Sequence, residues 1–211
     1  MKQIVIIDYG MGNLWSVQSA INYLGSKAVI SSDKSVIEES QCLVLPGVGS
    51  YRLAMEKLNQ TGLDKAIFKS LSDEETSILG ICLGMQLLGK SSDEDGYTEG
   101  LNIVPTSFHH FDNKSKDTSM KIPHVGFNSI EFKEDSGIFK GLENHSEFYF
   151  VHSYRALSKE IESKPEFNYA TCNYGVDFLA AFSWGNIHGT QFHPEKSQTN
   201  GLILLNNFIN K

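Results

Sequence analysis

The sequence predicts an α/β fold, in which a central, mostly parallel sheet is flanked by helices and carries an added antiparallel portion. In the first half of the chain, apolar strand-like runs alternate with segments whose apolar residues recur every three or four positions. This alternation is typical of parallel βαβ units with helices on both faces of the sheet. In the second half, strand-like runs follow one another across short gaps, which indicates antiparallel hairpins.

The first half opens with an apolar, β-branched run over residues 2–7, which we expect to be a strand. The next segment has the apolar spacing of a helix face, at Leu14, Val17, Ile21 and Leu24. Asn13 is suited to cap this helix and Gly25 to end it. By the same patterns we expect strands at residues 28–30, 42–45 and 77–81, and helices at residues 51–58, 63–71 and 83–88.

The second half begins with residues 108–119, where His, Asp, Asn, Lys and Ser predict an exposed loop or hairpin tip. Turns are expected at residues 173–175 and 184–186. We expect strands at residues 129–132, 147–152, 169–174, 178–184 and 187–192, and a final helix with Leu202, Leu205, Phe208 and Ile209 on one face. Because no repeat, low-complexity tract or linker interrupts the chain, residues 1–211 are expected to form a single domain.

Composition narrows the class of protein. The 211 residues carry a formal net charge of −7, which argues against nucleic acid or an anionic membrane surface as the main partner. No apolar run approaches the roughly 20 residues needed to span a bilayer. The N-terminal run is interrupted by Asp8 and lacks a signal-peptide layout. Three widely spaced cysteines without a C-x-x-C pattern indicate a reducing, cytoplasmic compartment.

One of these cysteines, Cys82, stands in the segment Gly80-Ile81-Cys82-Leu83-Gly84, between an expected strand and an expected helix. In the analogous G-x-S-x-G elbow, flanking small residues let the nucleophile occupy a sharp turn. A helix N-terminus there favours a thiolate, and the N–H of Leu83 is placed to bind an oxyanion. The alternative is an inert buried cysteine, which we retain for Cys42 and Cys172 because no glycines flank them.

A thiol nucleophile needs a base and a group that orients the base. His193 follows an expected strand and has Glu195 two positions on, so in an extended segment both side chains point the same way. The alternative is a surface turn at His193-Pro194-Glu195. His109, His110 and His145 lie in polar stretches, where we expect them to be solvated.

Three other segments bear on the site. Pro46-Gly47-Val48-Gly49 ends the third expected strand, at the sheet edge where α/β proteins bind ligands, although an ordinary turn has the same composition. Residues 149–154 end a strand in three polar side chains, suited to bind substrate or to cap the sheet. Gly10-Met11-Gly12 lacks the third glycine of a dinucleotide motif. No group of Cys, His and carboxylates has metal-ligand spacing, so we expect neither metal nor cofactor.

These segments together resemble a known family. With Ile7 to Asn13 and Pro123 to Asn128, they are similar to the class I, triad-type glutamine amidotransferases, and more narrowly to the glutaminase subunits of imidazole glycerol phosphate synthases. The resemblance covers essentially the whole chain. It implies the flavodoxin-like fold of class I glutamine amidotransferases, in one domain, and the hydrolysis of glutamine to glutamate and ammonia.

The resemblance also implies roles for particular residues and a partner. Cys82 would be the nucleophile, His193 the general base and acid, and Glu195 the orienting carboxylate. Oxyanion donors would lie at Leu83, Val48 and Gly49. Glutamine contacts would come from Gly47, Gln86, Glu94, His152, Ser153 and Tyr154. The ammonia would pass to a (β/α)₈ cyclase subunit in a heterodimer of histidine biosynthesis, and the loop at residues 46–49 would rearrange when the cyclase binds its ligand.

Alternatives remain at this level. The family usually has methionine and tryptophan where this chain has Val125 and Phe127, and segments at residues 88–92 and 170–175 are similar to a paralogous group that supplies ammonia for amidino sugars of surface polysaccharides. A stand-alone cysteine hydrolase would need no partner, and a non-catalytic subunit would have no need of the complete triad. Contacts with a partner are expected around Phe127, Asn128 and Lys196.

Overall fold

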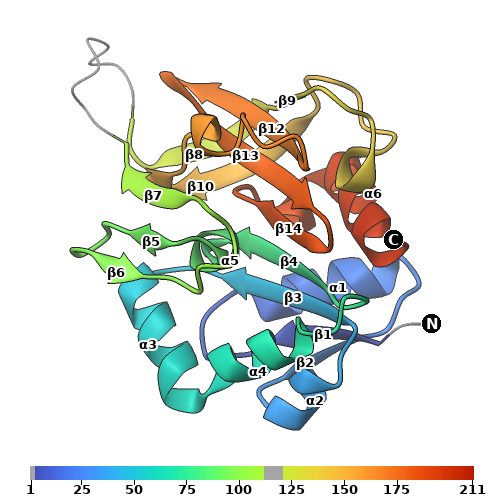
Figure 1. The fold of residues 1–211 in the computed structure, drawn as a ribbon. Coiled ribbons are helices and arrows are strands. Elements are labelled where there is room, and N and C mark those ends of the chain that lie inside the picture. The colour runs from blue at the N-terminus through green and yellow to red at the C-terminus, as the bar shows by residue number, and fades with distance from the viewer. Residues whose placement is uncertain (1–2, 112–120) are drawn as a thin grey trace.

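The structure, a computed structural model, describes residues 3–111 and 121–211. Its main sheet has eight strands in the order β2-β1-β3-β4-β14-β13-β12-β9 (Figure 1). The first five are parallel, and they are β2 (Ala28–Ser31), β1 (Ile4–Ile7), β3 (Cys42–Gly47), β4 (Ser77–Cys82) and β14 (Ile187–Thr190). Their order is that of flavodoxin-like doubly wound sheets, which confirms the predicted fold class.

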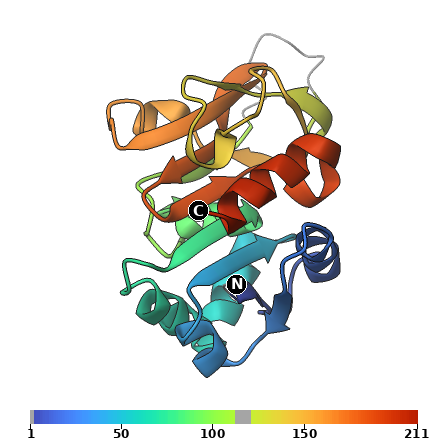
Figure 2. The same cartoon turned by 90° about the vertical axis from the view of Figure 1, so that its right-hand side faces the viewer.

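Helices cover both faces of the parallel strands (Figures 1 and 2). One face carries α1 (Leu14–Tyr23) and α6 (Gln198–Ile209), and the other carries α2 (Lys34–Glu38), α3 (Tyr51–Thr61) and α4 (Leu63–Ser70). Because side chains alternate along a strand, Ile4 and Ile6 enter one core cluster while Val5 and Ile7 enter the other. Because both faces of β1 are buried, all four of its residues are apolar and form a continuous apolar run in the sequence.

The antiparallel portion extends the main sheet and adds two smaller ones. β13 (Val176–Trp184), β12 (Phe167–Tyr174) and β9 (Glu131–Phe132) continue the sheet beyond β14. β8 (His124–Ser129) pairs with β10 (Glu147–His152), and β11 (Tyr154–Arg155), β7 (Ser107–His110), β5 (Ser91–Ser92) and β6 (Thr98–Glu99) form the third sheet. The helix α5 (Leu83–Leu88) and the 3₁₀ helices η1 (Gly137–Phe139), η2 (Ser158–Glu160) and η3 (Pro194–Lys196) complete the elements.

Several elements differ from the sequence-based expectation. The helix α2 was not expected, because a five-residue helix is too short to show a periodic pattern. The expected loop at 108–119 was wrong at its start, since Phe108 is fully buried in β7, and residues 112–119 lie outside the described residues. The strand expected at residues 129–132 is divided between the last residue of β8 (His124–Ser129) and β9 (Glu131–Phe132), and residues 124–128 were not expected to form a strand. Within residues 3–111 and 121–211, no helix is long and apolar enough to cross a membrane.

Candidate active site

The junction between β4 and α5 places Cys82 in a sharp turn. Its backbone has φ 54° and ψ −111°, a left-handed conformation that a residue with a Cβ rarely adopts. The flanking glycines make this turn possible because the chain packs very closely there. A Cβ on Gly84 would lie 1.7 Å from the carbonyl oxygen of Leu45, and one on Gly80 would lie 2.7 Å from the carbonyl oxygen of Gly84. The expected elbow is therefore present, and strain of this kind is found at functional sites.

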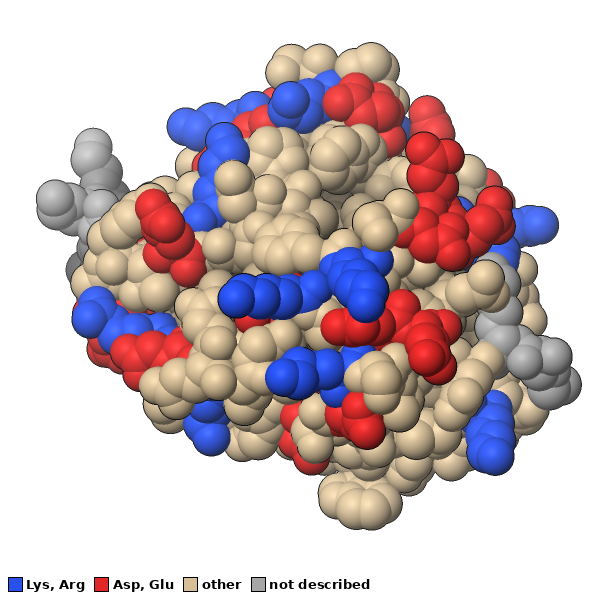
Figure 3. Space-filling model, turned by 60° about the horizontal axis from the view of Figure 1, so that its bottom comes forward, with Lys and Arg blue, Asp and Glu red and all other residues tan. Residues whose placement is uncertain are grey.

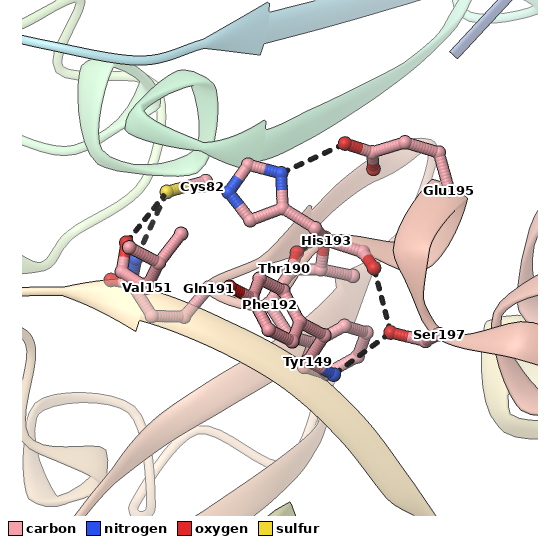
Figure 4. A network of polar contacts seen from close by, with 9 residues as sticks. All are labelled: Cys82, Tyr149, Val151, Thr190, Gln191, Phe192, His193, Glu195 and Ser197. Carbon is pink, nitrogen blue, oxygen red and sulfur yellow. Dashed lines mark hydrogen bonds and ion pairs between the residues drawn. The ribbon is translucent and has the colours of Figure 1, made fainter. Parts of the chain in front are cut away.

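The parallel neighbour of β4 brings His193 to the same place. β14 pairs with β4 in register, and three residues after its end His193 begins the turn into η3. Nδ1 of His193 lies 2.9 Å from Oε1 of Glu195, and the two side chains are only 2% and 1% exposed. Figure 4 shows the other ring nitrogen pointing toward the sulfur of Cys82. Cysteine, imidazole and carboxylate thus lie in line, and the surface-turn alternative does not fit this burial.

The charges of these three groups are coupled. Burial by itself would lower the pKa of His193, but the neighbouring Cys82 sulfur and the Glu195 carboxylate stabilise the protonated ring and raise its pKa to about 10. The protonated ring places a positive charge beside the cysteine sulfur, the kind of environment in which catalytic cysteines occur. The arrangement is therefore suited to nucleophilic attack by sulfur, followed by proton transfer from the imidazole.

Two residues that sequence reasoning did not single out also touch the sulfur. The carbonyl oxygen of Val151 and Nε2 of Gln191 each lie 3.8 Å from Sγ of Cys82. Gln191 precedes His193 by two positions, so the rule that residues i and i+2 share a side could have identified it. Its Oε1 accepts a hydrogen bond at 3.1 Å from Nε2 of Gln86, whose amide also donates to the carbonyl of Tyr154 at 3.4 Å.

A pocket of about 340 Å³ opens over the sulfur, a size within the range of small-molecule sites. Most of the residues expected from the sequence line it together. They are Val48, Gly49, Cys82, Leu83, Gln86, Glu94, His152, Ser153, Tyr154 and His193, joined by Pro123 and Val151. Glu195 and Gly47 are not among these lining residues. Glu195 instead lies behind His193, where it can orient the ring without meeting a ligand.

Gly47, at the end of β3, is packed so closely by its neighbours that no side chain would fit. A Cβ there would lie 2.4 Å from the hydroxyl oxygen of Tyr9 and 2.9 Å from Cβ of Leu83. The Tyr9 hydroxyl donates a hydrogen bond to the carbonyl of Pro46 at 2.9 Å, and burial, with the nearby Cys82 charge, raises the pKa of Tyr9. Tyr9 therefore stays protonated and anchors the strand end from which Val48 and Gly49 project.

Glu94 supplies a carboxylate to the pocket. Its Oε2 accepts a hydrogen bond from the backbone N–H of Tyr51 at 2.9 Å, and partial burial raises its pKa. The anchored carboxylate is a suitable partner for an ammonium group on a ligand.

The remaining candidates lie apart from the pocket. His109 lies 3.0 Å from Asp93 and is half exposed, as expected, and His145 is also exposed. Cys42 and Cys172 are buried in strands, which agrees with their structural interpretation. Nothing in the sequence indicates that His124, His152 and His188 would all be buried, as they are in the structure.

The chain belongs to the class I glutamine amidotransferases, since the family model described as "Glutamine amidotransferase class-I" matches residues 5–211. It is 44% identical over 213 residues to "Imidazole glycerol phosphate synthase subunit HisH 1" of Parasynechococcus marenigrum (strain WH8102), a match that covers 99% of this chain and 98% of the relative. It is also 44% identical over 207 residues to "Imidazole glycerol phosphate synthase subunit HisH" of Geobacillus kaustophilus (strain HTA426), which covers 98% of this chain and 95% of the relative.

A solved structure supports the fold independently. The crystal structure of a glutamine amidotransferase matches with a TM-score of 0.72 at 16% identity, over 98% of this chain and 97% of that chain. At this identity the likeness bears on the fold alone. Together with the family match, it confirms the predicted fold and the predicted resemblance.

Proposed function

We propose that Cys82, His193 and Glu195 are the catalytic triad of a glutaminase, and that this chain is the glutaminase subunit of an imidazole glycerol phosphate synthase. The single observation that carries the catalytic assignment is the line of groups in Figure 4, in which Glu195 holds Nδ1 of His193 at 2.9 Å and the opposite nitrogen points at Cys82. The strained elbow that presents the sulfur supports the same roles. The pathway assignment is supported by relatives of that name that cover nearly the whole chain.

The reaction follows from these positions. The Cys82 thiolate forms a C–S bond with the side-chain amide carbon of glutamine, and the carbonyl electrons move onto oxygen. As the carbonyl re-forms, the C–N bond breaks and His193 gives its proton to the leaving nitrogen, so ammonia departs. A water then loses a proton to His193 and attacks the thioester. The C–S bond breaks, glutamate is released and the thiolate returns.

The oxyanion needs backbone donors on the pocket side of the sulfur. Leu83 begins α5, so its N–H is free of an intrahelical partner, and Val48 and Gly49 line the pocket from the opposite loop. One such donor contributes roughly 3 kcal/mol to transition-state stabilisation in comparable enzymes. Gly49 has φ of 101°, a conformation open to glycine, which allows the peptide between Val48 and Gly49 to reorient.

The rest of the pocket suits the amino-acid end of glutamine. The Glu94 carboxylate would pair with the α-ammonium group, and Gln86 braces the wall formed by residues 152–154 through the Tyr154 carbonyl. His152 and Ser153 complete that wall, and Gly47 contributes by supporting the loop of residues 48–49. None of these steps requires a metal or a cofactor.

An exposed apolar row beside the pocket is the surface we assign to the cyclase subunit, a (β/α)₈ barrel in a heterodimer. On β8, Val125 is 56% exposed and Phe127 is 47% exposed, and Phe127 packs against Tyr149 with ring centroids 5.6 Å apart. Nζ of Lys196 lies 5.7 Å from the Tyr149 ring centroid. Val48, which lines the pocket, is itself 42% exposed. A partner seated here would cover the pocket mouth and receive ammonia before it meets bulk water.

Charge and thiol chemistry bear on other partners and on location. On the face shown in Figure 3, Lys and Arg side chains lie among Asp and Glu rather than in one continuous basic surface. This mixed charge disfavours a nucleic-acid partner. The proposed nucleophile must stay reduced, and neither Cys42 nor Cys172 forms a disulfide bond. We therefore place the complex in the cytoplasm, where thiols are kept reduced.

The test is glutamate release from glutamine by the chain mixed with the cyclase subunit encoded in the same genome, with and without the cyclase's ribonucleotide ligand. We expect strong stimulation that needs both additions. Cys82→Ser should abolish glutamine-dependent product formation and leave ammonia-dependent formation intact, with Cys172→Ser as the matched control. Unchanged glutamine-dependent activity in Cys82→Ser would refute the triad. Equal turnover without any cyclase would favour a stand-alone hydrolase, and a lack of stimulation would favour the surface-sugar paralogue.

A further inference from the structure

Behind the pocket, two buried histidines face each other across the small sheet. His124 on β8 is paired in register with His152 on β10, and Nδ1 of His124 lies 3.1 Å from Nε2 of His152. They are 3% and 6% exposed. His152 lines the pocket, whereas His124 does not. None of the catalytic steps derived above uses His124.

Both rings are neutral at physiological pH. Burial lowers the pKa of His124 to about 4. Burial is also the main cause that lowers the pKa of His152 to about 3, and the nearby His124, His193 and Arg155 act in the same direction. A neutral imidazole has one N–H donor and one acceptor nitrogen. Each ring can therefore donate only one hydrogen bond, and the surrounding partners decide from which nitrogen.

Those partners determine the direction of every bond. Nδ1 of His152 lies 2.8 Å from the carbonyl oxygen of Tyr154, which can only accept, so the proton of His152 is on Nδ1. Its Nε2 must then accept, and His124 must donate from Nδ1. That leaves Nε2 of His124 as an acceptor, opposite Nδ2 of Asn128 at 3.5 Å. Asn128 also donates to the carbonyl of Asn173 at 3.1 Å.

The same carbonyl connects this chain of bonds to the pocket. The Tyr154 carbonyl accepts from Gln86 as well as from His152, and Gln86 is bonded to Gln191, which contacts the sulfur of Cys82. The histidine pair therefore holds the wall of residues 152–154 from behind, while Gln86 holds it from the side of the nucleophile.

We propose that His124 is a positioning residue for the glutamine pocket, which acts by donating its Nδ1–H to His152 and so fixing the wall at residues 152–154. The proposal rests on the proposed glutaminase function. It also gives β8 a second role, because His124 points inward from the strand whose Val125 and Phe127 form the exposed apolar row.

A purely structural role for His124 would rest on its aromatic packing. Its ring is stacked between those of Tyr174 and Phe150, with centroids 4.0 and 4.9 Å away. The two roles can be separated by substitution. His124→Phe keeps an aromatic ring in the stack and removes the donor. His124→Asn removes the ring and keeps an amide N–H donor at the same number of bonds from Cα as Nδ1.

The experiment measures steady-state glutaminase kinetics of both variants in the complex with the cyclase subunit and its ligand. Loss of the donor leaves Nε2 of His152 buried and unpaired, so His124→Phe should raise KM for glutamine about tenfold. Its kcat should change much less, because the three catalytic groups keep their positions. His124→Asn should retain a KM near that of the wild type, although the variant unfolds at lower urea.

Opposite results would overturn the proposal: a normal KM in His124→Phe together with a raised KM in His124→Asn would assign His124 to packing alone. A second measurement needs no variant. In the wild-type complex labelled with ¹⁵N-histidine, NMR should find both His124 and His152 protonated on Nδ1, and an Nε2-protonated His152 would refute the scheme. If the wild-type complex released no glutamate, the proposed function would fail, whereas these tautomers would still be measurable.

Discussion

Acid should destabilise this fold through His188, a buried histidine of β14 outside the pocket. His188 is fully buried, its ring packs edge-on against Phe208 at 5.6 Å, and Nε2 lies 3.3 Å from Nζ of Lys211. Nδ1 is buried and has no hydrogen-bond partner among the described residues. Burial, and to a lesser degree the Lys211 charge, lowers the pKa of His188 to about 3. Replacement by leucine, of similar size, removes the titrating group.

The sign and size of this acid effect follow from the linkage between proton binding and folding. The unfolded chain binds a proton at His188 near pH 6.5, while the folded chain stays neutral until about pH 3. The contribution of neutral His188 is therefore complete above pH 6.5 and declines as the pH falls toward 3. The free energy of unfolding then falls by up to about 1.4 kcal/mol per pH unit, so roughly 2 kcal/mol of stability is lost between pH 7 and pH 5. The raised pKa of His193 acts in the opposite sense, with its contribution complete below pH 6.5 and lost as the pH rises through about 10.

Because several histidines titrate, the informative quantity is the difference in the free energy of unfolding between variant and wild type. Urea unfolding at pH 7, 6 and 5 should show His188→Leu gaining about 2 kcal/mol relative to wild type across this range. His109→Leu is the matched control, since it removes a half-exposed histidine rather than a buried one. Parallel pH profiles for His188→Leu and wild type would refute the reasoning.

Three further predictions concern the elbow at Cys82 and the proposed triad. Glu195→Gln removes the carboxylate that orients His193, and kcat/KM for glutamine should fall roughly 10²- to 10⁴-fold in the complex while KM changes little. Gly84→Ala places a Cβ 1.7 Å from the Leu45 carbonyl, so urea unfolding should show a loss of about 3 kcal/mol; a near-neutral change would contradict the close packing. Iodoacetamide should alkylate Cys82 in the folded chain, with protection by glutamine, and mass spectrometry should find Cys42 and Cys172 unmodified.

The parts of the fold that could be predicted are those whose signal is local. Ile4 to Ile7 and Ile78 to Cys82 are continuous apolar runs because both faces of each strand are covered, and the sequence shows this directly. The strand β8 could not be found in the same way. His124 points into an aromatic cluster while Val125 and Phe127 face outward, so polar and apolar residues occupy the opposite sides from those of an ordinary half-buried strand.

The residues of the candidate site also differ in how far the sequence reveals them. Cys82 with its glycines, and His193 with Glu195, each form a short segment whose chemistry can be interpreted without knowledge of the fold. Gln191 and Tyr9 gained their importance from contacts made only when distant strands meet. Tyr9 reaches Pro46 from a neighbouring strand, and Gln191 reaches the sulfur across two paired strands. The i, i+2 spacing places Gln191 on the same side of the chain as His193, but no spacing in the sequence specifies which distant strands pair.

The pairing of β4 with β14 also determines when the protein can act during its own synthesis. Gln191 and Cys82 are 109 residues apart in the chain, yet they meet because these two strands are neighbours. A nascent chain emerges from its N-terminus, so the sulfur leaves the ribosome long before His193, its proposed base. Until the last strand is seated, the thiol has neither imidazole nor carboxylate beside it. Under the proposed mechanism, an unfinished or truncated chain therefore consumes no glutamine and liberates no ammonia.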